Sequence, residues 1–145
     1  MPNSTTSLNP MAPRLGYAGL LPFALGAALV WLVRPEVLPY VSLGLQAWAG
    51  LVVSLLGGVY WGLGFRQAVP SPFPFAWGSL VAAVAWVGAV MPAHSGLVVH
   101  GVMFLVCYGV DRRHYKGLGA GDWLTMRFRL STGAALCCFL AAQGL

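Results

Sequence analysis

Five long apolar runs dominate the chain, and short polar or proline-rich segments separate them. Each run approaches the roughly 20 apolar residues that a helix needs to cross about 30 Å of hydrocarbon. None of them shows the strict alternation of apolar and polar residues that marks a strand, so the pattern predicts helices. We therefore expect an all-α, polytopic bundle of five transmembrane helices, at about residues 15–33, 40–65, 75–91, 96–110 and 123–142.

The segments between the runs set the predicted domain organisation. Residues 1–12 are polar and turn-forming, which predicts a disordered tail before a single transmembrane domain at residues 13–145. A cleaved signal peptide is an alternative for the first run, although this run continues to Val33 and ends at Arg34 as a spanning helix should. The third and fourth runs are short, so a re-entrant pair is an alternative there.

Basic residues are distributed unevenly between the two ends of such a bundle. With five spans, one side of the membrane receives seven of the eight Lys and Arg residues, and the other side receives Arg34 alone. Loops rich in Lys and Arg stay in the cytoplasm, which predicts an N-terminus inside and a C-terminus outside. The seven residues are Arg14, Arg66, Arg112, Arg113, Lys116, Arg127 and Arg129.

Composition agrees with the membrane interpretation and narrows the function. Apolar residues make up 59% of the chain and charged residues only 8%, whereas a soluble domain carries about 25% charged residues. The net charge of +5 comes from clusters that flank the apolar runs. We therefore expect contact with the lipid bilayer, including anionic lipid headgroups, and no binding of nucleic acid.

Small residues line one face of the second predicted helix. Gly50, Ser54, Gly58 and Gly62 follow one another at intervals of four, and Gly57 widens this face. In a bilayer, small residues let a neighbouring helix approach closely. We expect this face to pack against another helix of the same bundle, and a homo-oligomer seam or room for a ligand are the alternatives.

Three segments resemble one protein family. Residues 54–63 (SLLGGVYWGL) are similar to a Gly-Gly-x-His-Trp-Gly-like stretch in the second helix of the family called domain of unknown function 3429, which includes transmembrane protein 69. Residues 16–23 (GYAGLLPF) and 123–131 (WLTMRFRLS) resemble its opening and closing motifs. The resemblance implies a multi-pass inner-membrane protein and brings no biochemical activity with it.

This chain departs from the family pattern at three positions. Tyr60 stands where the pattern has His, Leu124 where it has Tyr, and Ser131 where it has Thr. A metal or proton role of the family's histidine would therefore be missing here.

The start of the last helix carries the most specific candidate site. Arg127 and Arg129 are two residues apart, so they point about 200° apart around a helix and cannot share a face. Arg127 matches the family motif and is expected to face inward, with Asp111 or Asp122 as partner, while Arg129 reaches the headgroups.

Aromatic residues near this arginine complete the candidate. An inner-leaflet ligand site would combine Arg127 with Tyr60, Trp61 and Trp123. The alternative is that these amphipathic aromatic residues only anchor the helices at the membrane interface.

The sequence lacks the residue sets of most enzymes and pumps. The three acidic residues, Glu36, Asp111 and Asp122, all fall near membrane edges, and no catalytic or metal-ligating motif is present. His100 lies within the fourth run, where we expect it to hydrogen-bond a backbone carbonyl or a hydroxyl. We therefore expect a protein that is not an enzyme and that holds no cofactor and no metal.

Two functions fit these observations. The preferred hypothesis is a non-enzymatic scaffold or assembly partner that acts through helix packing, as a homo-oligomer or within a larger membrane complex. The alternative is a binder or carrier of a small molecule or lipid, with its site near Arg127 and Trp61. A bacterial inner membrane is the favoured location.

Overall fold

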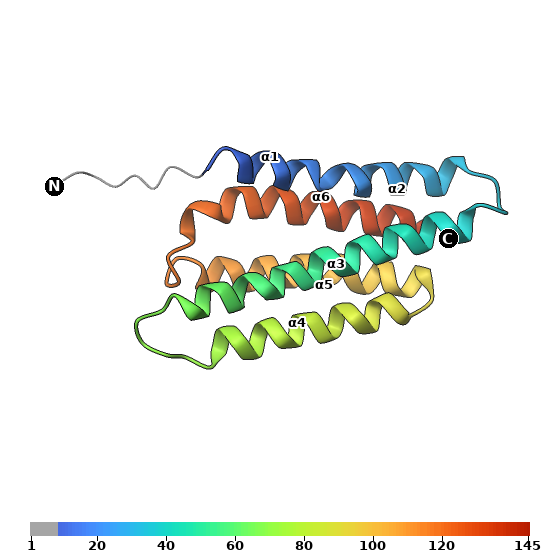
Figure 1. Cartoon of the computed structure of the whole chain (residues 1–145). Coiled ribbons are helices and arrows are strands. Elements are labelled where there is room, and N and C mark those ends of the chain that lie inside the picture. The colour runs from blue at the N-terminus through green and yellow to red at the C-terminus, as the bar shows by residue number, and fades with distance from the viewer. Residues whose placement is uncertain (1–8) are drawn as a thin grey trace.

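The computed structural model describes residues 9–145, and every regular element in this range is helical. Figure 1 shows long helices running side by side, with the first and last described segments at opposite ends of the bundle. The elements are α1 (Met11–Ala18), α2 (Leu20–Leu32), α3 (Leu38–Phe65), α4 (Phe73–Val90), α5 (Ala93–His114), the short 3-10 helix η1 (Gly121–Trp123) and α6 (Leu124–Gln143).

Helices α1 and α2 form one interrupted rod, and Pro22 explains the interruption. Proline has no N–H to donate to the carbonyl four residues earlier, and its ring pushes that carbonyl, here of Ala18, away. The two segments meet at Gly19, whose own N–H still donates to the carbonyls of Leu15 and Gly16 at 3.0 and 3.2 Å. The observed first rod is longer than the predicted run, because its helix already begins at Met11.

The other helix ends also follow from local chemistry. Pro39 and Pro74 lie in the first turns of α3 and α4, where a missing N–H costs nothing. Helix α5 extends beyond the predicted 96–110 at both ends, and its last turn carries Arg112, Arg113 and His114, which favour the negative end of the helix dipole. Gly119 then turns the chain with a φ of 82°, a conformation that suits glycine.

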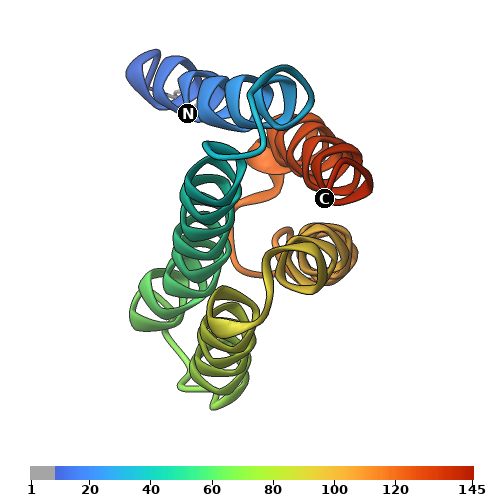
Figure 2. The same cartoon turned by 90° about the vertical axis from the view of Figure 1, so that its right-hand side faces the viewer.

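Within residues 9–145, the bundle consists of five long helical rods, of which α1 and α2 together form the first, and their packing leaves a gap between α3 and α6. Helix α3 packs on α2, α4 and α5, and α6 packs on α2 and α5. Viewed end-on in Figure 2, α3 and α6 lie on different sides of the bundle. Helix α6 contacts both α3 and α1 only sparsely, and α1 contacts α3 still less. A space between α3 and α6 therefore remains beneath α1.

Four of the rods have the character of membrane spans. Residues 11–32, α3, α4 and α5 are each long and apolar enough to cross a bilayer, which indicates a membrane protein. Many large apolar side chains face outward, including Leu21, Leu32, Tyr40 and Leu51, as lipid-facing residues do. Helix α6 has 20 residues and carries Arg127 and Arg129 near its start, and it is not among these four candidate spans.

The predicted boundaries hold to within a few residues, apart from the ends of α5 and the start of α1. Residues 1–8, most of the predicted disordered tail, lie outside the described residues. Met11 and Ala12, which the sequence assigned to that tail, belong to α1. The predicted short fourth run is a helix of 22 residues, which is long enough to cross the membrane in one pass.

Candidate functional site

A buried ion pair joins α5 to α6. The Arg127 guanidinium donates from Nη2 and Nε to the same Asp111 oxygen, Oδ2, at 2.9 and 3.1 Å. Asp111 is 1% exposed and Arg127 is 8% exposed. Of the two partners that the sequence offered, the structure selects Asp111, while Asp122 lies exposed in η1. Arg129 is exposed, so Arg127 faces inward and Arg129 faces outward, as their spacing predicts.

Helix α3 contributes the third member of this cluster. The Tyr60 hydroxyl donates to the other Asp111 oxygen, Oδ1, at 2.8 Å. Both carboxylate oxygens therefore accept hydrogen bonds from groups on different helices. A buried carboxylate needs such partners because it has left water, and each hydrogen bond to a charged group contributes about 1.5–3 kcal/mol. The cluster ties α3, α5 and α6 together at one depth.

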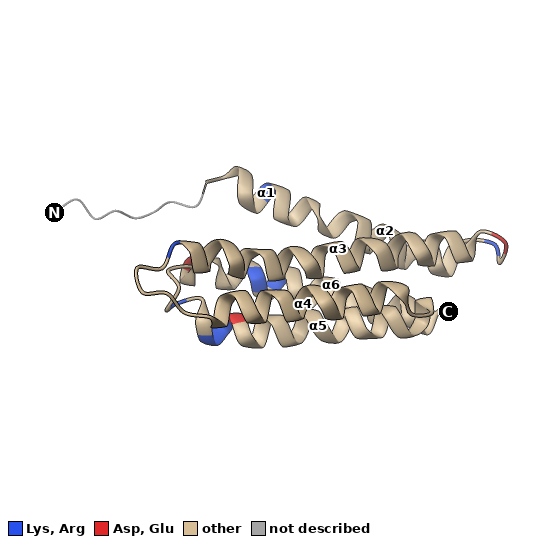
Figure 3. Ribbon diagram, turned by 60° about the horizontal axis from the view of Figure 1, so that its bottom comes forward, with Lys and Arg blue, Asp and Glu red and all other residues tan. Residues whose placement is uncertain are grey.

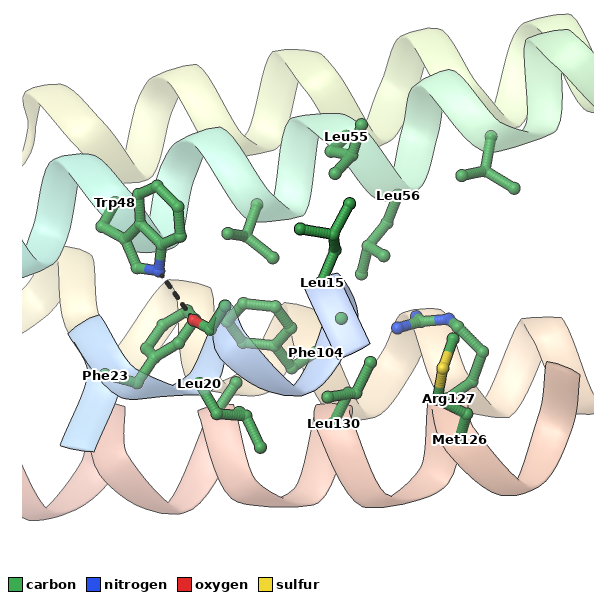
Figure 4. Close-up of a pocket in the computed structure, with 15 residues that line it drawn as sticks. Leu15, Leu20, Phe23, Trp48, Leu55, Leu56, Phe104, Met126, Arg127 and Leu130 are labelled. Atoms are coloured by element: carbon green, nitrogen blue, oxygen red, sulfur yellow. Dashed lines mark hydrogen bonds between the residues drawn. The ribbon is translucent and has the colours of Figure 1, made fainter. Parts of the chain in front are cut away.

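The guanidinium retains unused donors after pairing with Asp111. Arginine carries five N–H groups in a planar fork, and the pair uses only Nε and one Nη2 hydrogen. Within residues 9–145, no hydrogen bond to Nη1 is formed. Figure 4 shows the Arg127 side chain extending from α6 into a space bounded by Leu15, Leu56 and Leu130. The free edge of the fork therefore faces a cavity.

This first cavity, which we call the α1 cavity, has a volume of about 300 Å³. It lies beneath α1, between α3 and α6, and Phe104 of α5 forms part of its wall. Arg127 is its only charged lining residue, and the others are glycines or apolar side chains. They include Leu15, Gly16, Leu20, Phe23, Trp48, Val52, Leu55, Leu56, Val59, Met126 and Leu130.

A second cavity, which we call the Trp123 cavity, lies on the other side of the same arginine. Its volume is about 270 Å³. It shares Val59, Met126 and Arg127 with the α1 cavity, and its remaining walls are Leu63, Tyr115, Ala120 and Trp123. Arg127 therefore stands at the junction of two largely apolar spaces.

The Tyr115 side chain lies beside the same ion pair. Its ring centroid lies 5.7 Å from that of Tyr60, and the residue is 2% exposed. The hydroxyl lies close to both the Asp111 carboxylate and the Arg127 guanidinium, without a hydrogen bond of good geometry to either. Burial, with the Asp111 carboxylate nearby, raises the pKa of the Tyr115 phenol to about 12, so the hydroxyl keeps its proton.

Two contacts hold the part of the first rod that covers the α1 cavity. The Trp48 indole N–H of α3 donates to the Gly19 carbonyl at 3.2 Å, as Figure 4 shows, and so links α3 to the point where α1 and α2 meet. A Cβ atom on Gly16 would lie 3.3 Å from Leu130 Cδ1, so α1 approaches α6 closely there. The part of the first rod that covers the cavity is thus attached to α3 at Gly19 and to α6 one turn earlier, at Gly16.

Comparison with known families places the chain. A family model described as "Protein of unknown function (DUF3429)" matches residues 8–143. The chain belongs to this family. No curated protein and no solved structure matches it. The DUF3429 match covers every helix described above, including the three residues of the buried cluster.

In this DUF3429 protein, Trp61 does not join the candidate site, contrary to the sequence hypothesis. It follows Tyr60 by one residue on α3 and therefore points about 100° away. Trp61 is 42% exposed, and its indole N–H donates to the Phe75 carbonyl of α4 at 3.1 Å. Its ring also packs edge-on against Phe65 and Phe75. Tyr60, Trp123 and Arg127 remain together, while Trp61 anchors α3 to α4.

The glycine face of α3 also needs correction. Gly50 and Gly57 face inward: a Cβ atom on Gly57 would overlap the Gly78 carbonyl of α4, and one on Gly50 would lie 3.3 Å from His100 Nε2. Gly58 and Gly62 have open space around them, and Ser54 is half-buried. Residues four apart turn by about 400°, so each step shifts the position by about 40°, and the predicted single face divides between the bundle interior at Gly50 and the outside at Gly62.

His100 has a structural environment in the half of the bundle away from Arg127. It is fully buried, and its Nε2 lies 3.0 Å from the Ala85 carbonyl, as expected for a lone buried histidine. Its ring fills the space that Gly50 and Gly88 leave free. Nearby, Gln46 donates to the carbonyls of Gly88 and Met91, both at 2.7 Å. These bonds satisfy the last carbonyls of α4, which have no partner within their own helix.

Sequence reasoning missed most of the cavity wall. Tyr115 lies in no motif segment. Val59, Met126 and Gly16 do lie in the three segments that resemble the family's motifs, but nothing in the sequence indicates that these segments meet around one cavity. One signal was available: Pro22 predicts an interruption of the first helix, and the α1 cavity lies beside that interruption.

Proposed function

We propose that this DUF3429 protein is a non-enzymatic membrane protein that binds a lipid-like molecule in the α1 cavity, with Arg127 as the polar contact. One observation carries the proposal: the free edge of a buried guanidinium opens into an apolar cavity of about 300 Å³. Ligand sites are typically apolar spaces of about 300–1,000 Å³ with a few convergent polar groups. Trp123 supports the site from the second cavity, and Tyr60 supports it by fixing Asp111.

The length of the cavity supports a lipid-like occupant. Along α3 its lining runs from Trp48 to Val59, a rise of about 16 Å at 1.5 Å per residue. This length is about half of the roughly 30 Å of hydrocarbon in a bilayer, so the cavity has the depth of one leaflet. A chain lying in it would keep the orientation that it has in the surrounding lipid.

The membrane topology is part of the proposal. Figure 3 shows most Lys and Arg residues toward one end of the bundle, while the loop between α2 and α3 lies at the other end with Arg34 and Glu36. We propose that α6 is the fifth span, that the N-terminus is cytoplasmic and the C-terminus outside, and that the host membrane is a bacterial inner membrane. A reporter that is active only outside the cytoplasm should be active when fused after Leu145, and inactivity there would contradict this orientation.

Filling the junction of the two cavities should abolish binding. Val59 lines both cavities and is 38% exposed, so Val59→Trp places a large ring in the opening without entering the core. We expect lipid retained by the purified protein, measured by native mass spectrometry, to fall about tenfold or more, because overpacking costs about 1–3 kcal/mol.

A matched variant separates this effect from a general response to tryptophan. Val87 of α4 is 44% exposed and lines neither cavity, so Val87→Trp should leave the retained lipid unchanged. Equal retention by Val59→Trp and the natural protein would exclude the α1 cavity as the site. The elution volume of both variants in the same detergent monitors folding.

Assembly through helix packing is the second candidate function, and one observation favours it. Leu51, Leu55, Gly58 and Gly62 follow one face of α3, all exposed. A Cβ atom at either of these glycines would meet nothing within 4 Å, so another helix has room to approach. Gly58→Leu should then dissociate a homo-oligomer or a co-purifying complex. An assembly that survives this substitution would contradict the hypothesis.

A further inference from the structure

Resting on the proposed function, we infer that the ligand is a neutral single-chain lipid whose head carries a carbonyl oxygen, which accepts hydrogen bonds from the free edge of Arg127. The chain lies in the α1 cavity, and the small head group lies at the junction with the Trp123 cavity. This assignment differs from an anionic headgroup, which the basic residues alone would favour.

The first argument is the charge balance at the site. Asp111 lies 2.9 Å from Arg127 Nη2, so the buried cluster is already neutral before any ligand binds. A second anion on the guanidinium would leave one uncompensated negative charge among buried residues, and burying such a charge is costly. A neutral acceptor gains the same N–H donors without that cost.

The second argument is the absence of another cation facing the cavities in the described part of the chain. Lys116, Arg112 and Arg113 are exposed and line neither cavity, and Arg129 is exposed on the opposite side of α6. The walls beyond Arg127 are apolar or aromatic, with the uncharged Tyr115 hydroxyl as the remaining polar group. A phosphate or sulfate would therefore find one shared arginine and no further counter-charge.

The donor inventory selects the kind of neutral head. The polar groups left for a ligand at the junction are the Arg127 N–H groups that Asp111 does not use, and these are donors. A carbonyl oxygen has two lone pairs and can accept from both nitrogens of the free guanidinium edge. A head that lacks an acceptor leaves these donors unpaired.

The size of the site argues for a compact head on one chain. Arg127 is only 8% exposed, so the group that meets it lies inside the bundle rather than at the headgroup surface. The Trp123 cavity offers about 270 Å³ behind apolar walls, which excludes a hydrated zwitterionic head on energetic grounds. A single ester, ketone or amide meets both conditions.

A series of three ligands with matched chains tests the inference on the natural protein. Methyl laurate, laurate and dodecane differ only at the head, and their affinities are measured by displacement of retained lipid in detergent. We expect methyl laurate to bind about tenfold more tightly than dodecane, since a hydrogen bond to a charged group is gained, and laurate to bind no more tightly than the ester.

The outcomes separate the two levels of the proposal. Tighter binding of laurate than of methyl laurate, or equal binding of the ester and the alkane, would overturn the head assignment while leaving a lipid site. Binding of none of the three, with Val59→Trp indistinguishable from the natural protein, would remove the site itself. Retention of phosphatidylcholine against excess methyl laurate, after reconstitution in phosphatidylcholine vesicles, would overturn the single-chain assignment.

The charge argument has its own variant. Asp111→Asn keeps the shape of the side chain and an acceptor oxygen but removes the negative charge beside Arg127. In this variant laurate should gain at least about tenfold relative to methyl laurate, because its carboxylate replaces the lost counter-charge. An unchanged ranking in folded Asp111→Asn protein would contradict the role of Asp111. If this variant does not fold, the ligand series on the natural protein still decides the inference.

Discussion

Replacement of Arg127 by methionine is expected to destabilise the bundle by about 3–5 kcal/mol. The substitution leaves the Asp111 carboxylate 1% exposed with only the Tyr60 hydroxyl as a partner. Removing one member of a buried ion pair costs this much because the remaining charge is neither hydrated nor compensated. The free energy of unfolding in mixed micelles, followed by circular dichroism, measures the loss.

Two controls define the cause of that loss. Arg129→Met makes the same chemical change two residues away at an exposed position, where we expect less than about 0.5 kcal/mol. The double variant Asp111→Leu with Arg127→Met should recover most of the stability, since replacing both members of a buried pair by apolar residues is often neutral. A double variant as unstable as Arg127→Met alone would show that packing of the arginine, rather than the orphaned charge, holds the helices together.

The same cluster shows how stability and binding share one group. Asp111 holds one edge of the guanidinium and so fixes the direction of the other edge, which faces the α1 cavity. A ligand that competed with Asp111 for Arg127 would also loosen the contact between α5 and α6. A neutral acceptor on the free edge leaves that contact intact, so binding need not weaken the fold.

Much of the fold could be predicted because hydrophobic length is a local property. The apolar runs predicted helices close to those observed, and four rods have the length and apolarity of spans. The C-terminal end of α5 was missed because the polar residues 111–114 look like a loop in sequence, yet they continue the helix. Asp111 remains helical and buried because Arg127 and Tyr60 supply its partners from two other helices.

The candidate site was only partly predictable, because helical phase alone does not say which neighbour a face meets. The two-residue spacing correctly separated an inward Arg127 from an outward Arg129. It could not show that Trp61, adjacent to Tyr60, turns to α4 instead of α6. The cavity itself lies where α3 and α6 make only sparse contact, and this is a property of the packed bundle.

Gly57→Ala is expected to destabilise the protein by at least about 1–3 kcal/mol, although it adds a single methyl group. At this position the backbones of α3 and α4 meet: a Cβ atom on Gly57 would overlap the Gly78 carbonyl and lie 3.3 Å from Val81 Cβ. The overlap is with backbone, which cannot move aside without separating the two helices along their largest contact. The same unfolding measurement in mixed micelles quantifies the effect.

Gly58→Ala is the matched control, one residue along the same helix. Nothing lies within 4 Å of the added methyl group, and alanine favours a helix over glycine by up to about 1 kcal/mol. Gly58→Ala should therefore be neutral or slightly stabilising, so the two variants are expected to shift stability in opposite directions. Equal effects of the two variants would contradict the close approach of α3 and α4 at Gly57 and Gly78. A loss of stability confined to Gly58→Ala would instead place the tight contact on the lipid-facing side, where only a second chain or another protein could make it.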